Sequence, residues 1–199
     1  MGCIKSRCPV IYNSGSLWVA TSGARATVWR ENRNRALWRL YEAHRQEMFG
    51  YALLLTRDSG LAGDAVHEAL AKVAASNGRV RHMKTYVFRA IRNEALRLNA
   101  ARDRAEPFNE EEAESLFLLP EESNPHQRTV AREEAELLER ALDGIAFEQK
   151  QVIVLRVYAG LTFREIAAVL EEPLPTVASR YRRGLEKLGE RMRRLGYED

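Results

Sequence analysis

The chain has 199 residues, of which 45% are hydrophobic and 30% are charged, and its net charge is +3 at neutral pH. This composition is typical of a globular protein with one domain or two small ones. No run approaches the ~20 apolar residues of a membrane-spanning helix, so we expect no transmembrane helix. The small positive charge permits a polyanionic partner without requiring one.

Residues 1–34 are rich in Ser, Gly and Arg, and we expect them to form a disordered tail. Both cysteines, Cys3 and Cys8, lie in this tail, and no histidine or second cysteine pair stands at zinc-site spacing. We therefore expect no metal and no cofactor, and the cysteine usage favours a reducing, cytoplasmic location. The start MGCIKS also matches the N-myristoylation acceptor pattern, but so short a match weighs less than a plain flexible tail.

Helical periodicity begins near Arg35 and predicts three helices within residues 35–105. The second is expected over residues 62–75 and the third over residues 83–101, with a polar loop between them. The third helix carries a glutamate, Glu94, among its apolar positions, which leaves its exact inner face open.

Residues 106–128 are acidic and interrupted by prolines, and we expect them to form a flexible linker. Helical periodicity resumes over residues 129–199. There Thr162 and Glu165 form a T-x-x-E capping box that specifies the start of a short helix. Pro175 suits the first turn of the next helix, because the N–H that proline lacks has no partner there.

The helix after Pro175 has one apolar side and one basic side. The residues expected to face inward are Val177, Tyr181, Leu185 and Leu188. Those on the other sides are Thr176, Ser179, Arg180, Arg182, Arg183 and Lys187. This layout is typical of a helix-turn-helix whose second helix enters a major groove. A structural helical hairpin with a solvated basic surface is the other interpretation of the same pattern.

No strand pattern is evident, so the predicted class is all-α, with two small helical domains joined by an acidic flexible linker and a C-terminal helix-turn-helix. Basic segments on both sides of the acidic stretch suggest two modules that face nucleic acid. The four histidines are scattered and no glycine-rich phosphate loop exists, so no catalytic constellation is predicted.

Three stretches carry a family resemblance: AGDAVHEALAKV (62–73), FRAIRNEALR (88–97), and the run from Phe147 to Leu188. With them, the chain resembles a bacterial RNA polymerase sigma factor of the two-domain extracytoplasmic-function (ECF) type, over roughly residues 35–194. Four residues depart from the family pattern. They are His67 for glutamine, Tyr86 for tryptophan, Glu171 for the usual turn glycine, and Ala178 for lysine.

The resemblance implies that residues 35–105 form sigma domain 2, which binds core polymerase and the minus-ten promoter element. The implied core-binding positions are Asp64, Val66, His67, Glu68 and Lys72. The implied minus-ten positions are Asn77, Arg79, Arg81, His82, Tyr86, Arg89, Arg92 and Asn93. A flipped base requires polar edges and a stacking surface, and Tyr86 is the candidate for the latter.

Residues 129–199 correspond by the same resemblance to sigma domain 4, which reads the minus-thirty-five element. The base-edge candidates are Ser179, Arg180 and Arg183, and the phosphate candidates are Thr176, Arg182 and Lys187. The implied partners are core RNA polymerase, promoter DNA and an anti-sigma factor. The alternative function is a stand-alone helix-turn-helix regulator, which would bind duplex DNA without polymerase. A pure interaction scaffold leaves the basic helix unexplained.

Overall fold

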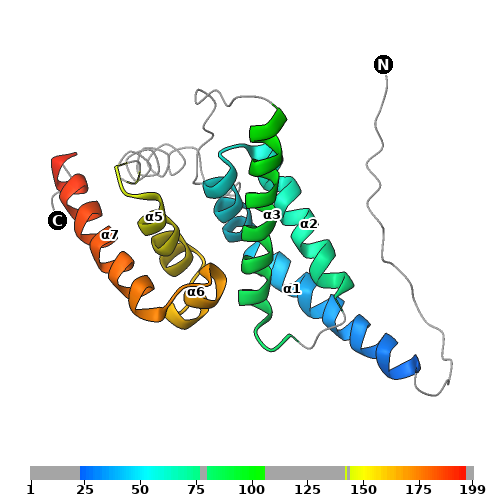
Figure 1. Ribbon diagram of the computed structural model, residues 1–199. Helices are drawn as coiled ribbons and strands as arrows, with labels where there is room; N and C mark the ends of the chain where they lie inside the picture. The colour runs from blue at the N-terminus through cyan, green and yellow to red at the C-terminus, as the bar shows by residue number, and fades with distance from the viewer. Residues whose placement is uncertain (1–22, 77–79, 106–141, 143, 196–199) are drawn as a thin grey trace, which may run out of the picture.

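The computed structural model describes residues 23–76, 80–105, 142 and 144–195, and all regular secondary structure among them is helical (Figure 1). The helices are α1 (Gly23–Thr56), α2 (Ser59–Ala75), α3 (Met83–Ala105), α5 (Phe147–Ile153), α6 (Phe163–Leu170) and α7 (Leu174–Arg194), with a π-helical turn, η2 (Val154–Tyr158), directly after α5. The prediction of an all-α protein with two small helical domains is confirmed.

The N-terminal domain consists of α1, α2 and α3, and each of these helices contacts the other two. Their apolar stripes meet in a core that includes Met48, Ala69 and Ile91, each with no exposed surface. The prediction of a disordered tail through residue 34 is wrong in its second part, because α1 already begins at Gly23. The predicted linker, residues 106–128, and the first part of the tail lie outside the described residues.

A tight turn joins α1 to α2. Arg57 takes a left-handed conformation with φ of 54°, and the Asp58 carboxylate then caps α2 by accepting from the Leu61 N–H at 2.7 Å. The last carbonyls of α1 are satisfied from α3, because Asn99 donates to the Leu55 oxygen at 2.8 Å and Arg102 donates to the Thr56 oxygen at 3.1 Å. Both ends of the turn are thus held by local caps and by the third helix.

The C-terminal domain is built from α5, η2, α6 and α7. Backbone hydrogen bonding changes from the α to the π pattern at Val154, a change that the helical periodicity of the sequence did not predict. Gly160 follows with φ of 64°, a conformation that glycine adopts without steric cost. The chain then enters α6, and both bonds of the predicted Thr162–Glu165 capping box are present.

The turn between α6 and α7 contains a left-handed residue that is not glycine. Glu171 ends α6 with φ of 60° and ψ of 39°, and Pro173 precedes α7. Pro175 lies in the first turn of α7, as predicted. α7 crosses α5 closely at Gly184, where an added Cβ would stand 2.8 Å from the Ile153 Cδ1.

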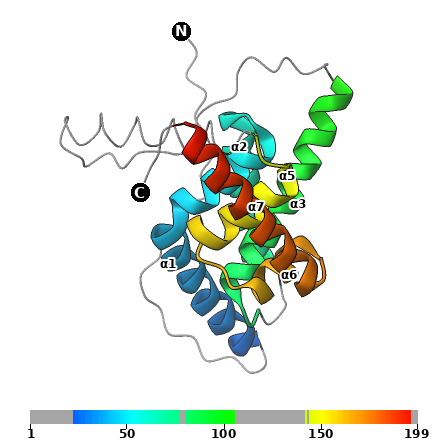
Figure 2. The same cartoon turned by 90° about the vertical axis from the view of Figure 1, so that its left-hand side faces the viewer.

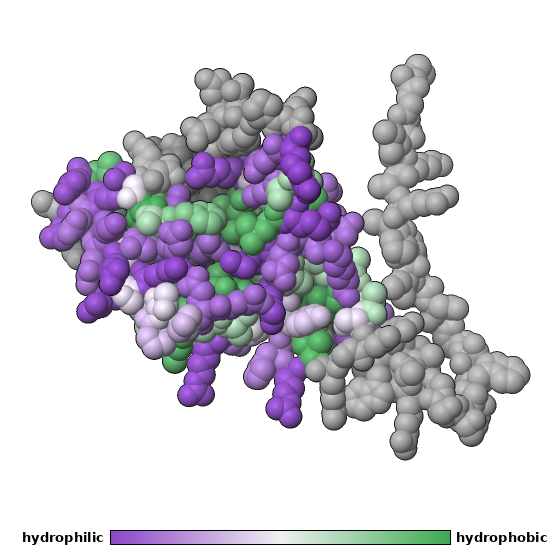
Figure 3. Space-filling view, viewed as in Figure 1, coloured by the Kyte–Doolittle hydropathy of each residue, from purple (hydrophilic) through white to green (hydrophobic). Residues whose placement is uncertain are grey.

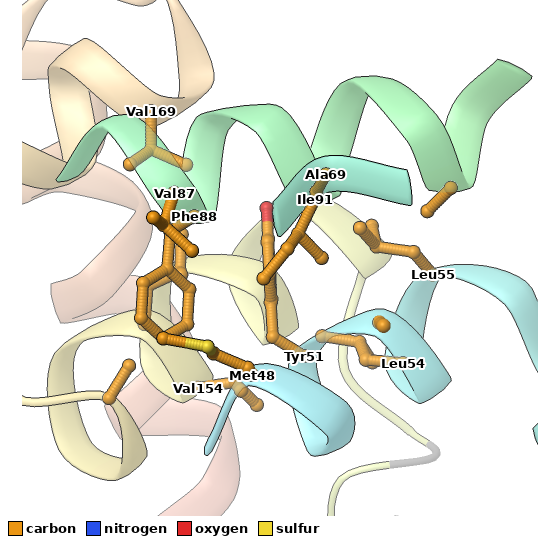
Figure 4. Packing of buried hydrophobic residues seen from close by; sticks show 14 of the residues in the cluster. Met48, Tyr51, Leu54, Leu55, Ala69, Val87, Phe88, Ile91, Val154 and Val169 are labelled. Atoms are coloured by element: carbon orange, nitrogen blue, oxygen red, sulfur yellow. The ribbon is translucent and has the colours of Figure 1, made fainter. Parts of the chain in front are cut away.

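The two domains share a continuous hydrophobic core. The buried cluster runs from Tyr51 in α1 through Phe88 in α3 to Val154 and Val169 in the C-terminal domain (Figure 4). In both ribbon views α3 lies beside α6 (Figures 1 and 2), and the two helices are in contact. The Tyr51 hydroxyl donates to the Gln151 side-chain oxygen at 3.3 Å within this core. Burial raises the pKa of Tyr51, so its hydroxyl remains a donor.

Candidate DNA-binding and polymerase-docking surfaces

The outward face of α7 is basic. Val177 is fully buried, which orients the helix as predicted, and Arg182, Arg183 and Lys187 are exposed to solvent. The remaining members of the predicted set, Thr176, Ser179 and Arg180, are half-buried. The prediction that Leu185 faces inward is wrong, since 39% of its surface is exposed.

Arg180 contacts the turn that precedes its own helix. Its Nη1 lies 2.5 Å from the Glu172 Oε2, and the exposed fractions of the two side chains are 29% and 27%. This ion pair holds the guanidinium against the helix-turn-helix turn. A base-edge role for Arg180 therefore requires that DNA replace this carboxylate.

The predicted minus-ten residues occupy the start of α3 and the loop before it. Asn77 and Arg79 lie outside the described residues, whereas Arg81 and His82 are exposed at the entrance to α3. Tyr86 has 41% of its surface exposed, so its ring is accessible rather than part of the core. On α3 the predicted set continues with Arg89, Arg92 and Asn93, of which only Arg92 is half-buried.

Arg89 forms an ion pair with Glu171, a residue of the C-terminal domain. One turn earlier on α3, the Thr85 hydroxyl donates to the Glu165 Oε1 at 3.3 Å. Hydrogen bonds from the Thr162 backbone and hydroxyl lower the pKa of Glu165, with smaller contributions from Thr85 and His82. The helix-turn-helix thus contacts the face of α3 where strand-binding cations are predicted.

The outward face of α2 carries the predicted polymerase-docking residues. Asp64, His67 and Glu68 are exposed at helical spacing on one side, and the C-terminal domain lies across α3 from α2 (Figure 1). Val66, which is also among the predicted core-binding positions, does not belong to this exposed set, because only 5% of its surface is accessible. It belongs to the buried apolar stripe of α2, which packs against the other helices of the N-terminal domain.

Lys72, the last predicted docking residue, belongs to an ion-pair cluster around Glu94. The Lys72 Nζ lies 2.5 Å from Glu94 Oε1, and the Arg97 Nε lies 2.8 Å from Glu94 Oε2. Burial acts to raise the pKa of Glu94, but the hydrogen bonds and charges of Lys72 and Arg97 outweigh it and lower that pKa. Glu94 is therefore a buried carboxylate that orients one cation from α2 and one from α3.

Within the described residues, no group of three or more His, Cys, Asp or Glu side chains is arranged to hold a metal ion. No helix in the same part of the chain is both long and apolar enough to cross a membrane. The face shown in Figure 3 is mostly hydrophilic, with smaller hydrophobic patches between the charged side chains. Most of the side chains that solvent or a partner can reach on this face are therefore charged or polar.

Two family patterns match the chain in the order of its two domains. Sigma-70 region 2 matches residues 40–105, and Sigma-70 region 4 matches residues 135–188. The first spans α2, α3 and the C-terminal half of α1, and the second includes the helix-turn-helix. The chain belongs to the ECF sigma factors. It is an RNA polymerase sigma factor that directs promoter-specific transcription initiation with core polymerase.

Curated relatives agree with this family. The ECF RNA polymerase sigma-E factor of Escherichia coli (strain K12) is 29% identical over 146 residues, which cover 69% of this chain and 76% of the relative. The protein of the same name from Salmonella typhimurium (strain LT2) is 28% identical over the same length. Sigma factors are DNA-binding regulatory proteins rather than catalysts, and the stand-alone regulator is not favoured because region 2 is also present.

Two solved structures of similar fold are complexes with a partner protein. The sigma factor RpoE in complex with the anti-sigma factor NepR, from Bartonella quintana, has a TM-score of 0.61 at 18% identity, covering 80% of this chain and 98% of that one. CnrH in complex with the cytosolic domain of CnrY has a TM-score of 0.56 at 19% identity, covering 84% of this chain and 94% of that one. At these identities the likeness establishes the fold.

Sequence reasoning missed three acidic residues that touch the candidate surfaces. Glu171 and Glu172 pair with Arg89 and Arg180, and Glu94 pairs with Lys72 and Arg97. A signal for the first was present in the sequence, because an acidic residue stands where the family usually has the turn glycine. No local signal pointed to the partner of Glu171, since Arg89 lies in another domain.

Proposed function

We propose that α7 binds the minus-thirty-five element in the major groove. The observation that carries this proposal is the exposed basic face of α7. α7 is the second helix of a helix-turn-helix in which α6 begins with a capping box and α7 begins with a proline in its first turn. Ser179, Arg180 and Arg183 are the proposed base contacts. Thr176, Arg182 and Lys187 are the proposed phosphate contacts.

The N-terminal domain is proposed to bind the minus-ten element as a single strand. The exposed ring of Tyr86 offers a stacking surface at the start of α3. Arg81, His82 and the loop residues Asn77 and Arg79 are proposed to contact the flipped base. Arg89, Arg92 and Asn93 follow on α3 and are proposed to bind the strand backbone.

The outer face of α2 is the proposed docking surface for core polymerase. It offers the exposed side chains of Asp64, His67 and Glu68. Lys72 adds its ammonium group at the edge of this surface, oriented by Glu94. Val66 is not part of the proposed surface, because it is buried.

Run-off transcription with purified core polymerase and a promoter library tests these assignments. We expect Arg180→Ala and Arg183→Ala to reduce promoter-specific transcription by about 5- to 100-fold, the value of a lost bidentate base contact, while core polymerase is still bound. Asp64→Arg or Glu68→Arg is expected to abolish retention on core polymerase in a pull-down. Loss of core binding in the α7 variants, or full retention of the α2 variants, contradicts the respective assignment.

Two further proposals concern the regulation of this sigma factor and its location in the cell. We propose that this sigma factor is held by an anti-sigma factor, as is the RpoE protein of similar fold. We further propose that it acts by binding, without a catalytic step, and that it works in the cytoplasm with the polymerase. Co-purification with a protein whose release restores transcription is the test of the anti-sigma proposal.

A further inference from the structure

The turn of the helix-turn-helix holds an acidic residue in a conformation that favours glycine. Glu171 has φ of 60°, a region where a Cβ is sterically disfavoured. Its carboxylate forms an ion pair with Arg89 of α3, 82 residues earlier in the chain. The glutamate at this position therefore links the two domains, which a glycine would not do.

The next residue, Glu172, also forms an ion pair with an arginine, but within the C-terminal domain. Glu172 pairs with Arg180 of α7 at 2.5 Å. Two consecutive carboxylates thus contact one arginine from the proposed minus-ten surface and one from the proposed minus-thirty-five surface. A carboxylate and a phosphate present similar oxygen acceptors to a guanidinium, so both compete for the same donor geometry.

The surrounding contacts place these carboxylates at the edge of a packed interface. Thr85 donates to Glu165 at 3.3 Å beside the Arg89–Glu171 pair. Near these polar contacts, Val87 and Phe88 of α3 pack in the same buried cluster as Val169 of α6 (Figure 4). The ion pair therefore closes over an apolar contact between the N-terminal and C-terminal domains.

We propose that Glu171 and Glu172 form an intramolecular carboxylate latch. In the free protein Glu171 occupies Arg89 and holds the C-terminal domain against α3, and Glu172 occupies Arg180, until DNA phosphates displace the carboxylates. The inference rests on the proposed function of these two arginines as DNA contacts. It adds that the helix-turn-helix turn itself regulates access to them.

The expected size of the effect follows from the exposure of the Arg89–Glu171 pair. The side chains of Arg89 and Glu171 are 48% and 53% exposed, and ion pairs of this kind shift an equilibrium by roughly two- to fivefold. Salt screens such pairs, so the latch weakens as ionic strength rises. The latch is thus weak enough for a polyanion to open.

Energy transfer between dyes on the two domains of the full chain tests the closed arrangement without DNA. Cys3 and Cys8 are changed to serine, and exposed positions carry the labels through Ala71→Cys and Gly189→Cys. Glu171→Gln removes the charge, and Glu171→Gly removes it while also relieving the backbone. We expect both to lower transfer at low salt, whereas Glu186→Gln, the same charge change at an exposed α7 position, leaves it unchanged.

The charge-swapped pair Arg89→Glu with Glu171→Arg is expected to restore transfer. Equal transfer in the unsubstituted protein, Glu171→Gln and Glu171→Gly overturns the latch. Because no DNA is present in this measurement, its result does not depend on whether Arg89 binds a promoter strand.

Fluorescence anisotropy with a mixed-sequence single-stranded oligonucleotide tests the competition. We expect Glu171→Gln to raise affinity roughly two- to fivefold above Glu186→Gln, and we expect this gain to vanish when Arg89 is already alanine. A gain that persists without Arg89 reflects net charge alone and overturns the competition. If Arg89→Ala by itself leaves oligonucleotide binding unchanged, the proposed DNA role of Arg89 fails while the energy-transfer result still decides the latch.

Discussion

α3 and α7 are both long basic helices, but they differ in how much of their surface other helices cover. α3 lies between the other two helices of its own domain and α6, and Val87, Phe88 and Ile91 along it have no exposed surface. α7 packs along one side only, and its buried residues are Val177 and Gly184. A helix covered on two sides has fewer positions left for a ligand than a helix covered on one.

The cations of the two helices differ in the same way. On α3, Arg89 and Arg97 are held by Glu171 and Glu94. On α7, Arg182 and Arg183 are exposed to solvent. Arg180 of α7 is also paired, with Glu172, so each basic surface is partly engaged by the protein itself, while Arg182 and Arg183 stay exposed on the C-terminal one.

The largest expected effect tests whether α3 is packed from both sides. Phe88 is fully buried, with its ring 5.9 Å from that of Tyr51, so Phe88→Ala is expected to lower the free energy of unfolding by about 3–5 kcal/mol. Urea unfolding followed by circular dichroism measures the loss. The control is Tyr86→Ala on the same helix, which is exposed and should cost less than about 1 kcal/mol. Similar losses for the two variants would contradict the described packing of α3.

The next effect tests the single packed face of α7. Gly184→Ala places a Cβ 2.8 Å from Ile153 Cδ1 and 3.2 Å from Gln149 Cβ, whereas Gly189→Ala meets nothing within 4 Å. Both gain the helix propensity of alanine, so their difference in unfolding free energy isolates the crowding, about 1–3 kcal/mol. Thermal melts of the two variants measure it. A Gly184→Ala variant as stable as Gly189→Ala would mean that α7 does not approach α5 this closely.

A smaller effect concerns the buried carboxylate that holds cations on α2 and α3. Glu94→Gln is expected to cost about 1–2 kcal/mol at neutral pH, since Lys72 and Arg97 remain half-exposed and regain water. The folded pKa of Glu94 lies below its ordinary value of 4.5. The stabilising contribution is therefore present above pH 4.5 and is lost as the pH falls through the folded pKa.

Urea unfolding of the Glu94→Gln variant and the unsubstituted protein across this pH range measures the change. The difference between them should shrink in acid. The exposed substitution Glu186→Gln provides the control and should show little change at any pH. If the difference in unfolding free energy stayed constant from pH 7 to pH 3, the ionised carboxylate of Glu94 would not be the source of the stabilisation.

The smallest effect tests the accessibility of the α7 cations. Arg182→Ala in the holoenzyme is expected to weaken binding to all promoters alike and to reduce the slope of log affinity against log salt by about 1. Titrations of promoter DNA at several salt concentrations measure this slope. An effect confined to one promoter sequence would instead place Arg182 at a base edge.

Local features of the helix-turn-helix were predictable from sequence. The Thr162–Glu165 capping box and the position of Pro175 depend on residues within one or two turns of each other, and both are confirmed. The buried position of Val177 follows from helical periodicity. The start of α3 at Met83 was likewise predicted from the pattern of its own residues.

The errors arose where burial depends on another element. Leu185 has the spacing of a core residue, but none of the described helices covers it well enough to exclude solvent. Val66 matches a docking position of the family, yet its side chain packs inside the N-terminal domain. Helical periodicity identifies a face, and only the neighbouring helices decide whether that face is buried.

The sequence by itself determined the helical class, the caps and turns of the helix-turn-helix and the charge of its second helix, because these rest on interactions between residues close in the chain. Tertiary structure alone decided that α3 packs against α6, that Glu171 meets Arg89 and that Glu94 joins Lys72 to Arg97. The Lys72–Glu94 and Arg89–Glu171 contacts join residues 22 and 82 positions apart. They form only when the apolar faces of the helices involved have packed together, and the hydrophobic effect that drives this packing has no direction of its own.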